Sequence, residues 1–310
     1  TLFPNTTLFR SLHLVYALQT TDPRYLQSFY ASHRLNEEAS NLGIDFSMEL
    51  ASAFDERLQT GKISTAGYSK LLIRGDYSID SMVTLENQGF TVINPAKAHA
   101  LCLDKLATAH WLKANSWPCP HTAQYTDEAM PIPAVLKPRY GKMGKGIVHI
   151  EKPEQLFEPS VQEALSRHEY LVQEYVSASY GKDIRFFFAD FGSSYTVAFE
   201  SHCSALCVLR QGSSFLSNAH AGGKMERYVP TDSLSTLAYA IFKASGLVYG
   251  TVDFLFTDTA GMGFTVCELN SMPSFEELER ATKANAARAI VRSCLHFLER
   301  TSSFSPKNML

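Results

Sequence analysis

The hydrophobic pattern changes near residue 100, and this change constrains the fold more than any other feature of the chain. Between residues 12 and 98, short apolar runs such as Leu12–Leu18 alternate with segments of helical spacing. That alternation predicts a parallel α/β unit. Over residues 134–209 the apolar runs read mostly as strands, interrupted by one helix near residues 153–167, and two more strands follow over residues 248–269. We therefore expect an α/β N-terminal domain of residues 12–98, joined to an α+β body of residues 99–310.

Charge and composition exclude several classes of protein. The 310 residues include 28 Lys plus Arg and 31 Asp plus Glu, which gives a net charge of −3. This balance argues against a surface that wraps nucleic acid, although it allows a local basic pocket. We therefore expect no nucleic-acid partner. No run approaches the roughly 18 apolar residues of a membrane span, so we expect no membrane partner either.

The cysteines and the first residues bear on location. The six cysteines form no C-x-x-C pair, and a chain of this length does not need disulfide staples. We interpret them as reduced thiols of a cytoplasmic protein. Residues 1–11 lack the features of a secretory signal, so we interpret them as an artefact or a disordered leader.

Three oxygen-bearing side chains lie in a predicted hairpin over Val248–Asn270. If the turn is centred just after Ala260, Asp253 faces Glu268, and Asn270 shares their face of the sheet. Two carboxylates directly opposite each other destabilise a sheet, whereas Mg²⁺ takes oxygen ligands and keeps phosphate partners. The pattern predicts a divalent-metal site. The alternative is a different register that leaves one carboxylate in solvent.

A loop rich in glycine and lysine follows a predicted strand. Glycines let backbone N–H groups approach a phosphate closely, and lysines supply positive charge. The loop matches neither the Walker A nor the dinucleotide-binding motif, so an ordinary hairpin tip is the alternative. The candidate phosphate-binding residues are Lys137, Gly141, Lys142, Gly144 and Lys145.

A third segment is an apolar strand with a polar edge. Its exposed backbone groups suit the edge of an adenine base, and Asp183 beyond it suits ribose hydroxyls. The alternative is a plain core strand. The candidate residues at this edge are Gln173, Glu174, Tyr175 and Val176.

In this order, the motifs resemble the ATP-grasp superfamily, and most closely its RimK-like carbon–nitrogen ligases. The resemblance extends over about residues 68–298. It includes the pair Asp104-Lys105, the segment Ser217–Lys224 and the segment Glu268–Pro273. It implies two sheets that enclose a nucleotide cleft, with a lid subdomain at about residues 120–175.

The resemblance also implies a role for each motif. Lys105 and Lys137 would contact ATP phosphates, and the loop Gly141–Gly146 would close over them. The strand edge would hold adenine, and Asp183 the ribose. Two Mg²⁺ ions, with Mn²⁺ as an alternative, would be held by Asp253, Glu268 and Asn270. The catalytic roles would fall to Lys137, Arg185 and Asn270, and Lys224 would join the nucleotide site.

The sequence departs from the family at two positions. Members often have Arg just before the Ser-Asn pair and again before the Gly pair, but this chain has Leu216 and Ala221. Such arginines stabilise the charge of a transferring phosphoryl group. Arg185, Arg210 and Lys224 are the candidates to replace them.

The implied activity is an ATP-dependent ligation. A carboxylate is phosphorylated to an acyl phosphate, and an amine displaces the phosphate to form an amide or peptide bond. The expected substrates are a small-molecule or peptide carboxylate and an amine of the amino-acid or glutamate type. Many members of the family are homo-oligomers, so a homo-oligomer is a further expectation. The alternative is a non-catalytic ATP-binding regulatory protein that resembles the synapsins. By position alone, we expect acceptor contacts from Arg74, Asp76, Ser274 and Glu276.

Overall fold

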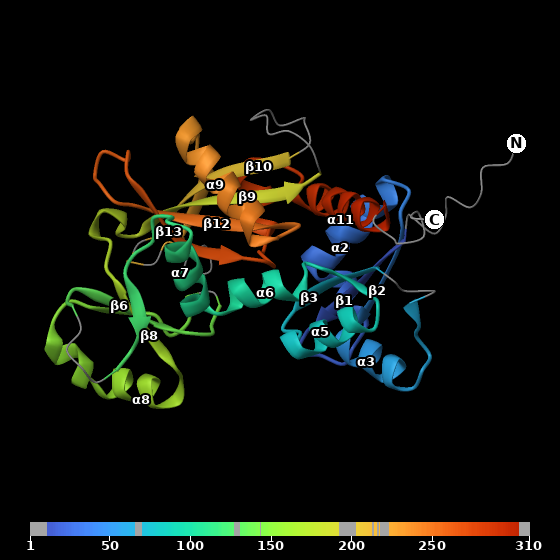
Figure 1. Ribbon diagram of the computed structural model, residues 1–310, viewed down its shortest axis with the longest axis horizontal. Coiled ribbons are helices and arrows are strands. Elements are labelled where there is room, and N and C mark those ends of the chain that lie inside the picture. The colour runs from blue at the N-terminus through green and yellow to red at the C-terminus, as the bar shows by residue number, and fades with distance from the viewer. Residues whose placement is uncertain are drawn as a thin grey trace, which may run out of the picture.

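The computed structural model arranges the chain around three sheets. The residues that it describes are 11–65, 70–126, 131–142, 144–191, 203–212, 214, 215, 217 and 223–303. Within these ranges the strands form two four-stranded sheets and one five-stranded sheet (Figure 1). No helix in the described ranges has the length and apolarity that crossing a bilayer requires. The expected leader as far as residue 10, together with Leu216 and Ala221, lies outside them.

The N-terminal unit is a parallel sheet with helices packed against it, as the alternating pattern predicts. Its strand order is β2-β1-β3-β4, and every pairing is parallel. The strands are β1 (Ser11–Ala17), β2 (Asp45–Leu50), β3 (Lys70–Gly75) and β4 (Thr91–Ile93). The helices are α1 (Arg24–Ser28), α2 (Tyr30–Asn41), α3 (Ala51–Gln59) and α5 (Ile79–Asn87).

The five-stranded sheet, which we call the body sheet, is antiparallel in the order β11-β10-β9-β12-β13. Its strands are β9 (Lys182–Asp190), β10 (Cys203–Gln211), β11 (Lys224–Arg227), β12 (Tyr249–Phe256) and β13 (Phe264–Asn270). Helix α9 (Asp232–Ser245) covers one face, where Phe186, Val252 and Phe254 are buried. The alternation of a strand sends the intervening residues, such as Asp253, to the other face.

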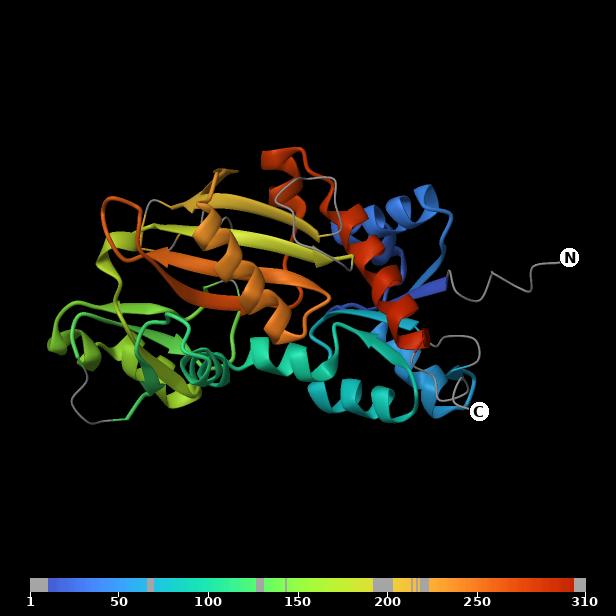
Figure 2. The same ribbon diagram turned by 45° about the horizontal axis from the view of Figure 1, so that its top comes forward.

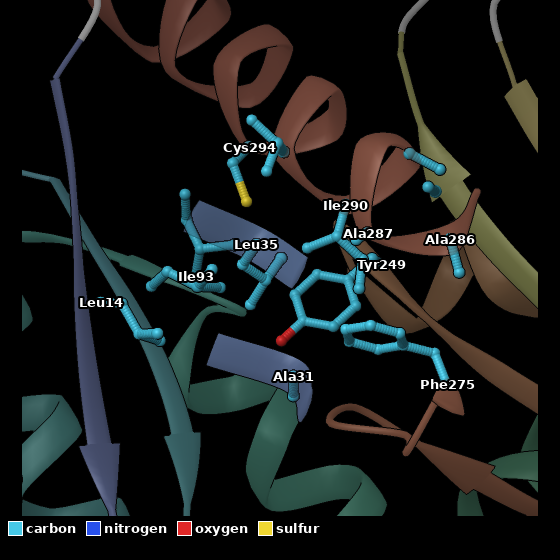
Figure 3. Packing of buried hydrophobic residues seen from close by; sticks show 14 of the residues in the cluster. Leu14, Ala31, Leu35, Ile93, Tyr249, Phe275, Ala286, Ala287, Ile290 and Cys294 are labelled. Carbon is cyan, nitrogen blue, oxygen red and sulfur yellow. The ribbon is translucent and has the colours of Figure 1, made fainter. Parts of the chain in front are cut away.

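That other face has an apolar end and a polar end. At the apolar end, Tyr249 packs between helix α2 and helix α11 (Ala286–Ser303), among Leu35, Ala287 and Ile290 (Figure 3). This packing joins the N-terminal unit to the body sheet. The polar end bears the charged residues described below, which line a cavity.

The third sheet, which we call the lid sheet, has the order β5-β8-β6-β7 and is antiparallel. It is formed by β5 (Thr122–Gln124), β6 (Ala134–Pro138), β7 (Val148–Ile150) and β8 (Tyr170–Glu174). Below it, η2 (Pro153–Phe157) and α8 (Pro159–Arg167) are separate helices. Pro159 explains the break, because a proline ring disfavours helical geometry at the residue before it. Glu158 is accordingly extended, at φ −62° and ψ 134°.

Helices α6 (Ala96–Leu103) and α7 (Lys105–Ala114) connect the N-terminal unit to the lid sheet (Figures 1 and 2). Asp104 separates them, because its side chain caps α7 by accepting from the N–H groups of Leu106 and Ala107. The short helix η3 (Ser177–Ser179) follows β8, and α10 (Glu276–Thr282) follows β13. This path puts Lys105 at the start of a helix beside the lid.

Candidate nucleotide and metal site

One cavity of about 610 Å³ lies between the lid sheet and the body sheet and reaches the N-terminal unit. This volume is within the usual range for small-molecule sites. Lys224 is exposed on β11 and is not among the lining residues. The predicted site residues that do line the cavity are Lys105, Lys137, Gly141, Lys142, Gly144, Lys145, Gln173, Glu174, Tyr175, Val176, Asp183, Arg185, Asp253, Glu268 and Asn270.

The hairpin of β12 and β13 puts Asp253 opposite Glu268, as its predicted register requires. Beyond this pair the register shifts, so that Phe254 pairs with Val266 and Cys267 is left as the extra residue of a β-bulge. The strand pairs nearest the turn are therefore centred half a residue earlier than predicted. The bulge at Cys267 restores the predicted pairing of Asp253 with Glu268. It also brings the Cys267 side chain to the cavity beside Glu268.

A buried cluster of two carboxylates and two arginines lies on the polar end of the body sheet. Arg185 donates two hydrogen bonds to Asp253, at 2.9 and 2.6 Å. Arg210 donates two to Asp183, at 2.6 and 2.8 Å, and one to Asp253, at 2.9 Å. Burial alone would raise the pKa of Asp253, but the two guanidinium groups hold that pKa below its usual value. Asp253 is therefore ionised over the physiological pH range.

Two lysines face the cavity from the lid side. The Lys105 ammonium donates to the Gly141 carbonyl at 2.7 Å, and the Lys137 ammonium lies 3.7 Å from the Cys267 sulfur. Burial lowers the pKa of Lys105, and the charge of Lys137 acts in the same direction, while Glu268 opposes it. An anion between the two ammonium groups would relieve their mutual repulsion.

The glycine-rich loop is held from two directions. Lys105 holds it through the Gly141 carbonyl, and Lys142 forms an ion pair with Asp76 of the N-terminal unit. Gly146 adopts a left-handed φ of +74°. A Cβ there would lie 2.9 Å from the Pro138 ring, so glycine is required at this position. The described residues of the loop therefore line the cavity and contact both the lid side and the N-terminal unit.

The strand edge expected to hold adenine lies at the end of β8. Glu174 donates its N–H to the His121 carbonyl at 2.9 Å, and Gln173 donates its side-chain amide to Thr122 at 2.9 Å. The Tyr175 ring packs against His149 in a tilted arrangement, with 4.0 Å between ring centroids. Adenine binding at Tyr175 and Val176 stays a prediction, as does ribose binding by Asp183.

The oxygen atoms near β12 and β13 suit a hard cation. Glu268 offers a carboxylate, and Asp253 offers one that Arg185 and Arg210 also contact. Asn270 uses its amide nitrogen in a 3.4 Å contact with Thr251, which leaves its oxygen available. The described part of the chain contains no group of three or more His, Cys, Asp or Glu that could hold a metal ion. The residues therefore fit a cation that takes its other ligands from phosphate or water.

Sequence reasoning missed the aromatic end of the cavity. Tyr16 comes from the end of β1, Phe29 and Tyr30 from the start of α2, and Phe275 from the segment before α10. The carboxyl ends of parallel strands are a common place for ligands, and this rule could have indicated Tyr16. The four acceptor contacts expected by position also line the cavity: Arg74, Asp76, Ser274 and Glu276.

Comparisons with known proteins agree with this architecture. A "probable alpha-L-glutamate ligase" of Trichodesmium erythraeum (strain IMS101) is 28% identical over 94% of this chain and 97% of its own length. A "tetrahydromethanopterin:alpha-L-glutamate ligase" of Methanocaldococcus jannaschii is 24% identical, over 84% and 87%. The solved D-alanine–D-alanine ligase of Bacillus anthracis shares the fold, with a TM-score of 0.68 at 15% identity over 94% and 99% of the two chains.

The family follows from a domain model. The RimK-like ATP-grasp domain matches residues 114–294, which is more than half of the chain. The match includes the lid sheet, the body sheet and the hairpin of β12 and β13. The expected ATP-grasp fold is confirmed, and the chain belongs to the RimK-like ATP-grasp family.

Proposed function

We propose that this protein is an ATP-dependent carboxylate–amine ligase that forms an amide bond and releases ADP and phosphate. One observation supports this most strongly: a single cavity joins Lys105 and Lys137 of the phosphate side to Asp253, Glu268 and Asn270. Membership of the RimK-like ATP-grasp family and the ligase names of the relatives support the same activity.

Positioning and charge account for the catalysis. A free carboxylate is a poor acylating agent, and phosphorylation gives it a leaving group. Lys105 and Lys137 would hold the phosphates in line with that carboxylate. The glycine-rich loop, held to Asp76 by Lys142, would exclude water that hydrolyses the acyl phosphate.

Asp253, Glu268 and Asn270 would hold the divalent cation. When bound, it supplies positive charge that neutralises the phosphates. We propose Mg²⁺, with Mn²⁺ as an alternative, and two ions. Arg185 and Arg210 already contact Asp253, and from there they would turn toward a phosphate oxygen. They are our candidates for the role of the arginines that Leu216 and Ala221 replace.

We propose an amino acid as the amine substrate, with L-glutamate as the first candidate, because two relatives are named as alpha-L-glutamate ligases. The carboxylate substrate is a small molecule or a peptide. A cytoplasmic location, a homo-oligomer and the division into domains of residues 12–98 and 99–310 remain our predictions. The free thiols of Cys102, Cys119, Cys207, Cys267 and Cys294 agree with a reducing compartment.

The test measures Mg²⁺-dependent ADP release with a panel of amino acids and small peptides. We expect release to require one acid and amine pair and to vanish in Glu268→Ala. Glu226→Ala is the matched control, because Glu226 lies exposed on β11 of the same sheet. Tight ATP binding without turnover on any pair would contradict the ligase and support the regulatory alternative.

A further inference from the structure

Arg74 is a buried cation at the N-terminal end of the cavity. It lies near the end of β3, and only 3% of the residue is exposed, yet it lines the cavity. Lys105 and Lys137 lie on the lid side of the cavity, whereas Arg74 belongs to β3 of the N-terminal unit.

Neutral groups surround the Arg74 guanidinium. It donates to the Tyr249 hydroxyl at 3.1 Å and to the Pro273 carbonyl at 2.9 Å. The rings of Tyr16, Tyr249 and Phe275 lie with their centroids 5.9, 5.9 and 5.4 Å from it. Figure 3 shows the Tyr249 and Phe275 rings side by side. The third nitrogen, Nε, is buried and has no hydrogen-bond acceptor among the described residues.

Within the described ranges, no carboxylate lies at ion-pair distance from Arg74, whereas the nearby acids have their own cations. Asp76 pairs with Lys142, and Arg280 pairs with both Glu276 and Glu277. Buried charges in proteins are normally paired, because desolvation of a lone charge costs several kcal/mol. A guanidinium with a free donor beside a cavity is therefore matched to an anion that enters the cavity.

The position of Arg74 shows which part of a ligand it can reach. Its partner Tyr249 lies four residues before Asp253 on β12, which corresponds to about 13 Å along the strand. A group bound at Arg74 therefore lies several bonds away from the carboxylate that is activated beside Asp253. The planar fork of a guanidinium suits a carboxylate, and the aromatic rings would exclude water from that pair.

We propose that Arg74 binds a non-reacting carboxylate of a ligase substrate. This inference rests on the proposed ligase function. The carboxylate has two sources: the amine substrate's own carboxylate, or a second carboxylate of the acid that is activated. Both present the same group to Arg74, and the experiment distinguishes them.

The experiment uses the acid and amine pair that supports ADP release by the wild-type enzyme. Each non-reacting carboxylate of that pair is replaced in turn by a primary amide, and kcat/KM is measured for the wild type and for Arg74→Met. We expect one amide to reduce wild-type kcat/KM on the order of 100-fold, since an unpaired buried charge is left behind. In Arg74→Met the same amide should change kcat/KM less than about 5-fold. The amide that has this effect identifies the source.

Controls separate recognition from support of the fold. Arg74→Lys keeps the charge but loses the fork, so we expect intermediate discrimination even if Arg74→Met does not fold. Arg24→Met removes an exposed arginine of the same unit and should leave discrimination unchanged. Equal discrimination in wild type and Arg74 variants would overturn the proposal and make Arg74 a brace between Tyr249 and Pro273. No turnover with any pair would instead refute the ligase function, and the proposal with it.

Discussion

The two sheets that face each other across the cavity differ in size and in chemistry. The lid sheet has strands of three to five residues and four buried hydrophobic residues in its core. In the body sheet, β9 and β10 are nine residues long, and buried clusters cover both faces. The lid sheet presents lysine, glycine and a strand edge to the cavity, and the body sheet presents buried ion pairs.

The buried ion pairs and the groups that close over a ligand need different structural support. A buried cluster of arginines and carboxylates is costly unless its geometry is held firmly, so it lies on the sheet with the larger core. Groups that must close over a ligand belong on an element that opens at low cost. We therefore expect the lid sheet to open separately from the body sheet.

The largest effect should come from breaking the buried ion cluster. Arg210→Met leaves Asp183 and Asp253 short of a cation, so we expect the free energy of unfolding to fall by about 3–5 kcal/mol. Urea denaturation measures it. Arg139→Met is the matched control, since Arg139 pairs with Asp104 on the lid side in a more exposed position and should cost much less. Equal costs would refute the contrast between the two sheets.

A pair of fully buried leucines compares the two cores directly. Leu136→Ala in the lid sheet and Leu269→Ala in the body sheet each remove the same atoms, at a cost of about 3 kcal/mol. Hydrogen exchange should show Leu136→Ala exposing the lid strands while body amides stay protected. Leu269→Ala should lower the protection of the body. If Leu136→Ala weakened both sheets equally, the lid would not be a separate unit.

The pH dependence should come from the body side of the cavity. Burial, helped by the charge of Lys142, lowers the pKa of His99 to about 4, and its ring bonds Ser271 after β13. The unfolded chain binds that proton near pH 6.5, so the stability from neutral His99 is lost as pH falls from 6.5 toward 4. We expect a loss of about 2 kcal/mol by pH 5, absent in His99→Gln. Parallel pH profiles of the two proteins would contradict this.

The smallest effect should come from the loop. Lys142 is half exposed and pairs with the exposed Asp76, so Lys142→Ala should change the free energy of unfolding by less than about 1 kcal/mol. The effect should shrink further in high salt, because exposed ion pairs are screened. A change of several kcal/mol would show that the loop is part of the core rather than a closing element.

Much of this was predictable from local patterns, and the rest depends on long-range packing. The expected hairpin register predicted that Asp253 lies opposite Glu268, but no local sequence feature marks the bulge at Cys267. The break before Pro159 follows from proline chemistry and was missed when one helix was expected there. The isolation of Arg74 depends on Tyr249 and Phe275, which are distant in sequence, so only the folded chain reveals it.

The most direct test of the ligase follows oxygen. The acid that supports turnover is labelled with ¹⁸O in its carboxylate, and the phosphate released with ADP is examined by mass spectrometry. If the carboxylate attacks ATP and an amine displaces phosphate, one labelled oxygen must move to phosphate for each amide formed. Our account predicts this transfer in the wild type and none in Glu268→Ala. Amide formation with unlabelled phosphate, or ADP release without an amide, would contradict it.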